Sequence, residues 1–234
     1  MDKQQIIIEE LICKFKIYKM KDGRQLYELS TQELQRLLEE RRKEMMKLHR
    51  ITDKELETKF NLRELFAMQK ELDKRIDYRD EDRIELKFYS LHVEVNEAWN
   101  ETMSFKFWSK RFKEPDTDKL LEELIDGLHF LLSIVLDINT STRSNHNFIG
   151  CFNYAKIHSR HIYSVNRLFE MWSTTVLKAK KKWVAYRIFP VAELRIMFGV
   201  FFRICYLYDF TYKDIVRAYK EKNKENFIRQ ASGY

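Results

Sequence analysis

The sequence is poor in the residues that interrupt helices or cross-link loops. It has only 5 glycines and 2 prolines among 234 residues, which disfavours a sandwich or barrel and favours long helices. The 3 cysteines are an odd number and lie far apart, a pattern typical of free thiols in a reducing cytoplasm. No apolar run reaches the roughly 18 residues of a membrane span, and the first residues lack a signal-peptide pattern, so we expect no membrane association.

What the sequence has in abundance is charge, and the charge is unevenly distributed. Lys and Arg total 43 against 36 Asp and Glu, giving a net charge of +7. Residues 62–139 carry an acidic excess, whereas residues 140–234 are strongly basic. This division suits a cation site followed by a polyanion site, but on charge alone a solvated basic surface or a nucleic-acid-binding surface is the better explanation. Because the basic residues are spread over several predicted helices, we expect no specific nucleic-acid partner.

Residues 1–60 are predicted to form an accessory extension separate from the rest of the chain. Apolar and polar residues alternate on both sides of Asp22-Gly23, which indicates a β-hairpin. Thr31 can then cap a charged helix running from about Gln32 to His49. The segment contains no catalytic constellation, so we predict a small hairpin-plus-helix unit.

From Asn61 onward, apolar residues recur at the spacing of buried helix faces. The pattern predicts helices over residues 62–72, 81–105, 117–138, 160–182, 186–208 and 211–228, with a polar loop over 139–159. The third helix is apolar nearly all round and should be enclosed, and the aromatic-rich helix 186–208 should form core or a subunit interface. We therefore predict an all-α, multi-helix bundle spanning residues 61–234.

Two pairs of carboxylates lie within these apolar helices. Glu94 and Glu97 form one pair and Glu123 and Asp126 the other, and each i, i+3 spacing places both acids on one helix face. Carboxylates in apolar surroundings must be neutralised, paired or bound to a cation. Four clustered oxygen ligands suit a hard cation such as Mg²⁺. The spacing alone is common in charged helical proteins, so the flanking sequences decide whether it indicates a metal site.

Those flanking sequences resemble a known family. E-V-N-E-A-W-N-E-T-M-S-F-K-F-W-S, followed by E-L-I-D-G-L-H-F-L-L-S, is similar to the dimeric dUTPases of bacteria and phages. These enzymes belong to the all-α NTP pyrophosphohydrolase (MazG-like) superfamily. Residues 65–76 and 218–234 resemble the first core helix and the C-terminal substrate motif of the family, so the likeness spans about 62–234. It implies a cytoplasmic homodimer in a bacterium or a phage-infected cell.

The resemblance also implies roles for individual residues. It matches Glu94, Glu97, Glu123 and Asp126 to Mg²⁺ ligands, and Lys222, Asn226 and Arg229 to substrate-binding positions. Steps of four and three place the latter three on one helix face, where Lys and Arg can grip phosphate oxygens.

The resemblance brings the helix of Gln69 and Asp73 to the nucleoside, where the Gln69 amide can pair with the uracil edge. Ordinary helix polarity is the alternative for this pair. Lys106 can reach a phosphate, and Trp108 can pack on the base or sugar or, alternatively, belong to the core. His129 is best interpreted as a hydrogen-bonded structural histidine.

The function implied is Mg²⁺-dependent hydrolysis of dUTP, and also of dUDP, to dUMP, with pyrophosphate released from dUTP. Metal ions on the four acids would bind the triphosphate and activate a water, and Glu97 would take the proton from that water. One alternative is a dCTP or broader NTP pyrophosphohydrolase. Another is a protein that binds a regulatory partner through residues 1–60.

Overall fold

The computed structural model describes residues 3–15, 17–20, 22–41, 62–76, 82–106, 108, 115–142 and 164–232. The chain divides into two compact units, Met1–Phe60 and Asn61–Tyr234. All regular structure in the described ranges is helical, apart from one isolated β-bridge. None of the described helices is long and apolar enough to cross a membrane.

The first unit has a small core of its own. Helix α1 (Lys3–Phe15), the 3-10 helix η1 (Leu26–Glu28) and a helix over residues 31–41 contribute to it. Its buried side chains are Ile7, Leu11, Leu26, Leu29, Leu34, Leu37 and Leu38. The helix at 31–41 is capped by Ser30 rather than by Thr31, since Ser30 and Glu33 exchange backbone and side-chain hydrogen bonds in a capping box. Residues 42–49 of the predicted helix lie outside the described residues.

The predicted hairpin is wrong except for its turn. Residues 12–15 of its expected first strand belong to α1, because Ile7, Leu11 and Phe15 recur at helical spacing and pack into the small core. Asp22-Gly23 does form a tight turn, with Gly23 at a φ of 92°. A single antiparallel bridge between Lys19 and Gln25 flanks that turn, and the chain then enters η1. The helical spacing of apolar residues over 7–15 therefore determines the structure there, and the alternation of apolar and polar residues does not.

The second unit confirms the predicted all-α architecture. Its helices are α3 (Leu62–Asp73), α4 (Arg83–Glu101), α5 (Thr117–Thr142), α7 (Val165–Tyr186), α8 (Val191–Leu207) and α9 (Tyr212–Ala231). Side-chain caps fix several starts: Asp82 accepts from the Glu85 amide, and Thr211 forms a capping box with Asp214. Helix α5 extends into the predicted loop as far as Thr142, and residues 143–163 lie outside the described part of the chain.

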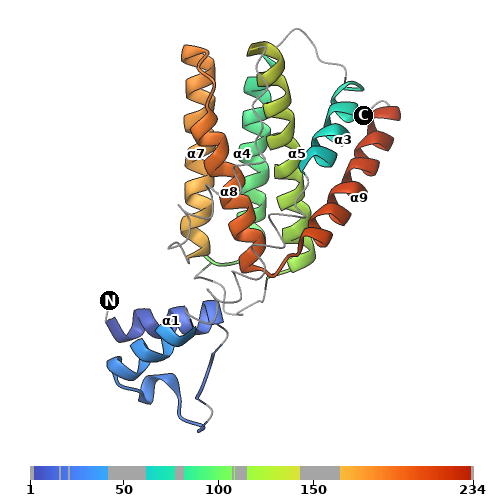
Figure 1. Ribbon diagram of the computed structural model, residues 1–234. Helices are drawn as coiled ribbons and strands as arrows, with labels where there is room; N and C mark the ends of the chain where they lie inside the picture. Colours follow the sequence, from blue (N-terminus) through green and yellow to red (C-terminus); the bar gives the residue numbers. More distant parts are fainter. Residues whose placement is uncertain are drawn as a thin grey trace. The chain divides into compact units, whose positions relative to one another are not determined.

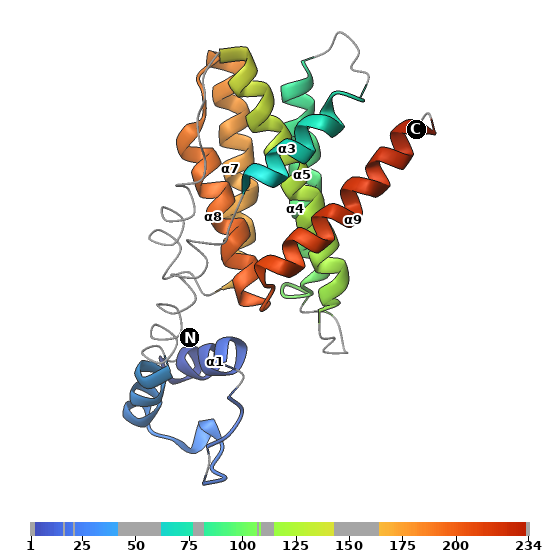
Figure 2. The same ribbon diagram turned by 45° about the vertical axis from the view of Figure 1, so that its right-hand side comes forward.

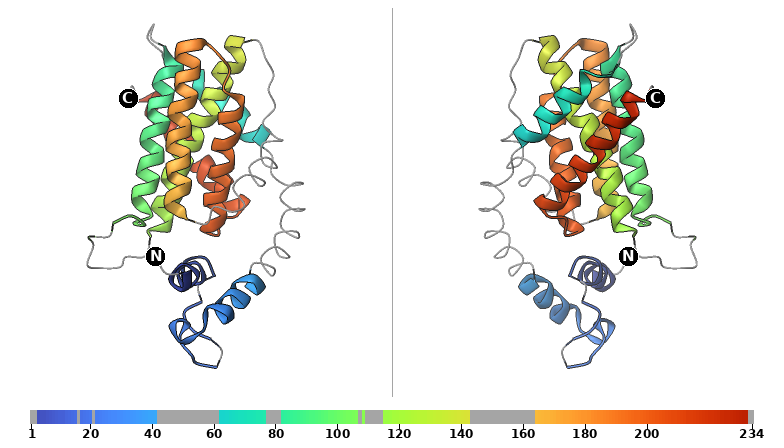
Figure 3. Two further views of the ribbon diagram at one scale, coloured as in Figure 1. Left: turned by 90° about the vertical axis from the view of Figure 1, so that its left-hand side faces the viewer. Right: turned by 90° about the vertical axis from the view of Figure 1, so that its right-hand side faces the viewer.

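Four of these helices form a bundle, and the other two lie against one side of it. Helices α4, α5, α7 and α8 pack side by side, with α4 against α5 and α7, and α8 against α7 and α5 (Figure 1). Helices α3 and α9 contact each other and both pack on α5 (Figure 2). Two further views show α3 and α9 crossing the same face of the bundle (Figure 3). This arrangement places residues of α3, α4, α5 and α9 around one space.

The core of the bundle uses the predicted apolar stripes. Phe88, Leu91 and Val95 of α4 are fully buried, and so are most apolar residues of α5. The aromatic residues Phe198 and Phe201 of α8 are also buried within the chain, so this helix supplies core. Gly127 lies where the Trp172 ring of α7 approaches α5 closely, and a Cβ there would meet that ring at 3.6 Å. Close packing of α5 against its neighbours holds the acids of α4 and α5 at a fixed separation.

Candidate active site

Three of the four predicted carboxylates meet in space. Ligand oxygens of Glu94 and Glu97 on α4 and of Glu123 on α5 lie within 4.8 Å of one another. Glu94 and Glu123 are half-buried, and Glu97 is exposed. Helices α4 and α5 run antiparallel (Figure 1), and Glu94 and Glu97 of α4 meet Glu123 of α5 at their interface. The arrangement offers several hard oxygen donors to one position, which is the donor set that Mg²⁺ prefers.

The electrostatics of this cluster show that its negative charge is under-compensated. Burial raises the pKa of Glu94 to about 7, and the neighbouring charges of Asp126, Glu97 and Glu123 add to the effect. Burial also raises the pKa of Glu123 to about 7, with Asp126 and Glu97 as the next causes. Carboxyls that hold their protons up to neutral pH mark a place where a cation would be favourable.

The fourth acid, Asp126, is bound to a lysine of α9. The Lys222 ammonium lies 2.7 Å from an Asp126 carboxylate oxygen and 3.0 Å from one of Glu122. Burial and nearby acids still raise the pKa of Asp126, although the Lys222 bond opposes this shift. Burial lowers the pKa of Lys222, but hydrogen bonds to Asp126 and Glu122 outweigh it, so the net pKa is raised and the ammonium stays charged. Lys222 thus supplies one positive charge beside four acids.

A cleft of about 230 Å³ connects the acid cluster with α3 and α9. Glu94 and Asp126 lie at its acidic end. Its other lining residues are Gln69, Leu72, Asp73, Ile76, Lys87, His129, Phe130, Ser133, Lys222, Asn226, Arg229 and Gln230. The structure therefore brings the predicted residues of α3 and α9 to the same space as two of the predicted metal ligands. Arg229 also forms an ion pair with Glu225, one turn earlier on α9.

A family model described as dUTPase matches residues 61–234. The chain belongs to the all-α, dimeric dUTPase family. The chain is accordingly a dUTP diphosphatase, and its family uses a divalent metal ion, which the acid cluster fits by its donor type and excess negative charge. A second family model, Fur-regulated basic protein A, matches residues 3–40. No curated protein matches the chain in a search of whole sequences.

In this dUTPase family member, Gln69 of α3 joins three helices through one amide. Its Oε1 accepts a hydrogen bond of 2.7 Å from the Tyr219 hydroxyl of α9 and lies 2.7 Å from His129 Nδ1 of α5. Its Nε2 donates to Asp73 Oδ1 at 2.7 Å. Gln69 is only 3% exposed, so the amide is an integral part of the cleft wall and not an ordinary surface polar group.

Asp73 is held by a buried ionic network that the sequence interpretation missed. Ser133 donates to Asp73 Oδ2 at 2.6 Å, and the Lys87 ammonium lies 3.6 Å from the same oxygen. Lys87 also bonds Asp137 at 2.7 Å, and Arg83 lies 3.0 Å from the other Asp137 oxygen. The sequence did contain one sign of this network, because the charged residue Lys87 interrupts the apolar stripe of α4. Lys87 lies seven residues before Glu94, on the same helix face.

The remaining candidates lie elsewhere or act structurally. Lys106 and Trp108 follow α4 and are not among the residues that line the cleft. Trp108 is 61% exposed, which rules out the core alternative for its side chain. His129 is buried, stacks on the Tyr219 ring at 4.0 Å and bonds Gln69, which confirms a hydrogen-bonded histidine. Burial, helped by the Lys222 charge, lowers the pKa of His129 to about 3, so its ring is neutral.

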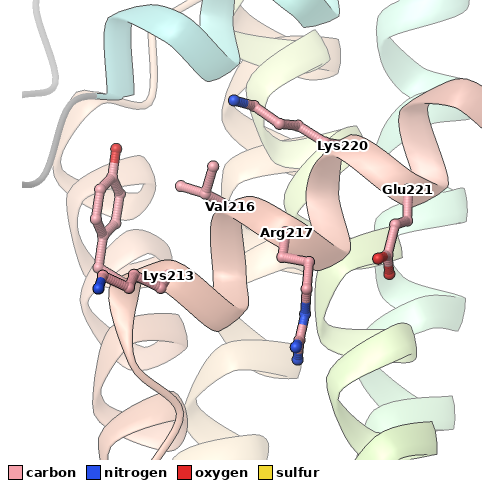
Figure 4. Close-up of a pocket in the computed structure, with 6 residues that line it drawn as sticks. Lys213, Val216, Arg217, Lys220 and Glu221 are labelled. Carbon is pink, nitrogen blue, oxygen red and sulfur yellow. The ribbon is translucent and has the colours of Figure 1, made fainter.

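A second hollow, of about 420 Å³, lies on the outer side of α9 (Figure 4). Its lining comes from that single helix: Tyr212, Lys213, Val216, Arg217, Lys220 and Glu221. Lys220 bonds Glu64 of α3 at 2.6 Å, and Arg217 lies 3.4 Å from Asp214. The charged side chains point outward from the helix and enclose no common point, so this surface is not a candidate active site.

Proposed function

We propose that the chain catalyses Mg²⁺-dependent hydrolysis of dUTP and dUDP to dUMP, releasing pyrophosphate from dUTP. The observation that carries the proposal is one cleft with clustered acids at one end and Lys222 and Arg229 along its side, in a chain of the dUTPase family. Acids that fit a metal and basic side chains that fit phosphates have to lie close together if they are to bind a metal–triphosphate complex.

In this proposal Glu94, Glu97, Glu123 and Asp126 hold the metal. A bound Mg²⁺ would neutralise charge on the triphosphate and lower the pKa of a water molecule. Glu97, the exposed member of the cluster, takes the proton from the attacking water. Lys222, Asn226 and Arg229 of α9 contact the phosphate oxygens, and release of Lys222 from Asp126 frees both groups for their ligands.

The nucleoside occupies the other end of the cleft, next to Gln69 and Asp73. Lys87 and Ser133 line the cleft at that end. Lys87 lies seven residues before Glu94 on α4, and Ser133 lies seven residues after Asp126 on α5. At 1.5 Å per residue, the two ends are about 10 Å apart along the helix axes. That length suits a nucleotide with its base at one end and its phosphates at the other. Lys106 and Trp108 contact the phosphates and base only if the segment after α4 approaches the bound nucleotide.

A nucleotide panel tests this function. Purified protein with Mg²⁺ should convert dUTP to dUMP and pyrophosphate, convert dUDP to dUMP and phosphate, and lose activity with a chelator. Product chromatography identifies which bond is cleaved. Equal kcat/KM for dUTP and dCTP would contradict uracil specificity and favour the broader NTP pyrophosphohydrolase.

We further propose that residues 1–60 form an accessory unit for a regulatory protein partner, separate from the catalytic unit 61–234. The support is its own buried core around Leu11, Leu26 and Leu34, and its match to a different family from the rest of the chain. Deleting residues 1–60 should leave dUTP hydrolysis intact and abolish binding of that partner. A truncated protein with strongly reduced kcat would instead assign the unit a role in catalysis.

A further inference from the structure

The direction of the Gln69 amide is dictated by only one of its three partners. A hydroxyl such as that of Tyr219 both donates and accepts, and a neutral imidazole such as that of His129 exchanges these roles by changing its tautomer. An ionised carboxylate only accepts. Asp73, 2.7 Å from the amide nitrogen, is therefore the partner that forces Gln69 to present its NH₂ group on that side.

The remaining hydrogen bonds follow from that constraint. With Nε2 on the Asp73 side, Gln69 Oε1 is an acceptor and takes hydrogen bonds from both the Tyr219 hydroxyl and His129 Nδ1. His129 must then carry its proton on Nδ1, which leaves Nε2 as an unprotonated acceptor. His129 Nε2 is buried and has no partner among the described residues.

The cleft wall consequently has a fixed hydrogen-bonding pattern. Both lone pairs of Gln69 Oε1 are used, whereas its NH₂ group keeps one hydrogen beyond the bond to Asp73. The wall thus holds one unused donor hydrogen on Gln69 and one unused acceptor, the buried Nε2 of His129. Uracil presents carbonyl acceptors beside an N3–H donor. Cytosine presents an amino donor beside a bare N3 acceptor, which is the opposite pattern.

Asp73 keeps its acceptor role because one cation and one hydroxyl donor lie against its second oxygen. Ser133 donates to Oδ2, and Lys87 lies 3.6 Å from that oxygen while it also bonds Asp137. Lys87 is almost fully buried. An ammonium favours an acceptor beside it, so Lys87 maintains the acceptor that sets the direction of the Gln69 amide.

We propose that Asp73 and Lys87 are positioning residues that make the enzyme select uracil over cytosine by fixing the direction of the Gln69 amide and the tautomer of His129. This inference rests on the proposed function, because it assumes that the base lies against this wall. An asparagine at position 73 could either donate or accept, so the amide and imidazole could then reverse together and accept cytosine.

The test compares kcat/KM for dUTP and dCTP in the wild type, Asp73→Asn and Lys87→Met. We expect the dUTP-to-dCTP ratio to fall by about tenfold or more in both variants, because a reversed amide no longer opposes the amino group of cytosine. Arg83→Met is the matched control, since Arg83 contacts Asp137 of the same network but not Asp73. That control should retain the wild-type ratio.

A second readout does not depend on turnover. Nitrogen chemical shifts of His129 in the wild type should show a proton on Nδ1 and none on Nε2, and Asp73→Asn should shift the ring toward the other tautomer. A wild-type ring protonated on Nε2 would overturn the inference even if the variants failed to fold, and so would an unchanged ratio in folded Asp73→Asn or an equal loss in Arg83→Met. Absence of any wild-type preference for dUTP would instead refute the proposed function.

Discussion

The ammonium of Lys222 lies 2.7 Å from the carboxylate of Asp126 and links α9 to the acid cluster of α4 and α5. Both side chains are largely buried, with exposed fractions of 11% and 17%. In the absence of a metal, this lysine partly compensates the excess negative charge at the acidic end of the cleft.

Replacing Lys222 with Met should destabilise the metal-free protein by about 1–3 kcal/mol, because Asp126 would lose its counter-charge in a largely buried site. Added Mg²⁺ should raise the melting temperature of the variant more than that of the wild type, since the metal replaces the missing charge. Lys220→Met is the control, because the Lys220–Glu64 pair is exposed and should contribute little. Equal stabilisation of Lys222→Met and wild type by Mg²⁺ would contradict the counter-charge role.

The stability of the metal-free protein should depend on pH through Glu94. Its pKa is about 7 in the folded protein, against an ordinary value of 4.5. Between these pH values the unfolded chain releases a proton that the folded protein retains, so stability is lost as pH rises through 7. Glu94→Gln mimics the protonated form. Relative to the wild type, the free energy of unfolding of Glu94→Gln should increase by about 1 kcal/mol as the pH rises from 5 to 8. This figure is reduced because Glu94 is partly exposed.

Thermal melts of both proteins at matched pH values measure that difference. Other groups, such as His129, titrate in both proteins and largely cancel in the comparison. A stability difference that stays constant from pH 5 to 8 would show that Glu94 ionises normally in the fold.

Glu97→Gln should reduce kcat for dUTP by about a hundredfold or more, because the water loses its proton acceptor and the metal loses a ligand. The melting temperature should change little, since Glu97 is exposed. Glu85→Gln on the same helix is the control and should keep full activity. Retention of wild-type kcat in Glu97→Gln would remove Glu97 from the mechanism.

Gly127 should tolerate one methyl group but not a large side chain. An added Cβ would make ordinary contacts of 3.6 Å with Trp172 and 3.8 Å with Leu91. Alanine therefore should stabilise α5 by up to about 1 kcal/mol through helix propensity, whereas leucine should destabilise the fold by about 1–3 kcal/mol through overpacking. Denaturant unfolding of the two variants provides the measurement, and a stable Gly127→Leu protein would show that the α5–α7 contact is loose.

The homodimer that the family resemblance implies can be tested at an exposed apolar stripe on α4. Leu86, Tyr89 and Val93 follow one another at steps of three and four, and each is about half exposed. Val93→Glu should shift the protein from dimer to monomer in light scattering coupled to size exclusion. Ile188→Glu, also at an exposed apolar position, should leave the oligomeric state unchanged. A dimer that survives Val93→Glu would place its interface elsewhere.

The sequence predicted the helices of the second unit well because their periods are long and uninterrupted. Phe88, Leu91 and Val95 mark the buried face of α4 without any knowledge of its neighbours. The prediction of an N-terminal hairpin was wrong because residues 12–18 fit both the two-residue period of a strand and the 3.6-residue period of a helix. The choice depended on Ile7 and Leu11 packing with Leu34, which is a contact between distant parts of the unit.

The acids could be singled out from spacing and flanking motifs, but the network behind the cleft could not. Lys87 and Asp137 are 50 residues apart, and each alone reads as a polar interruption of an apolar helix. Their pairing depends on the register between α4 and α5, which no local pattern specifies. The bonding direction of Gln69 likewise required the position of Asp73 relative to two other helices.

Helix α9 is anchored mainly along its first half, and near its end the Phe227 ring lies 4.7 Å from the Arg75 guanidinium, just after α3. Ile215 and Tyr219 are buried, and the Tyr219 hydroxyl is bonded to Gln69, whereas Ile228 is 60% exposed. The helix cannot leave the bundle as a whole without breaking the Tyr219–Gln69 bond in the wall proposed to bind the base. We therefore expect substrate entry and product release to involve only its last turns, including Arg229. Amide hydrogens after Glu225 should exchange faster than those before Asn223. The contacts proposed for the nucleoside would then stay in place while the phosphate end of the cleft opens.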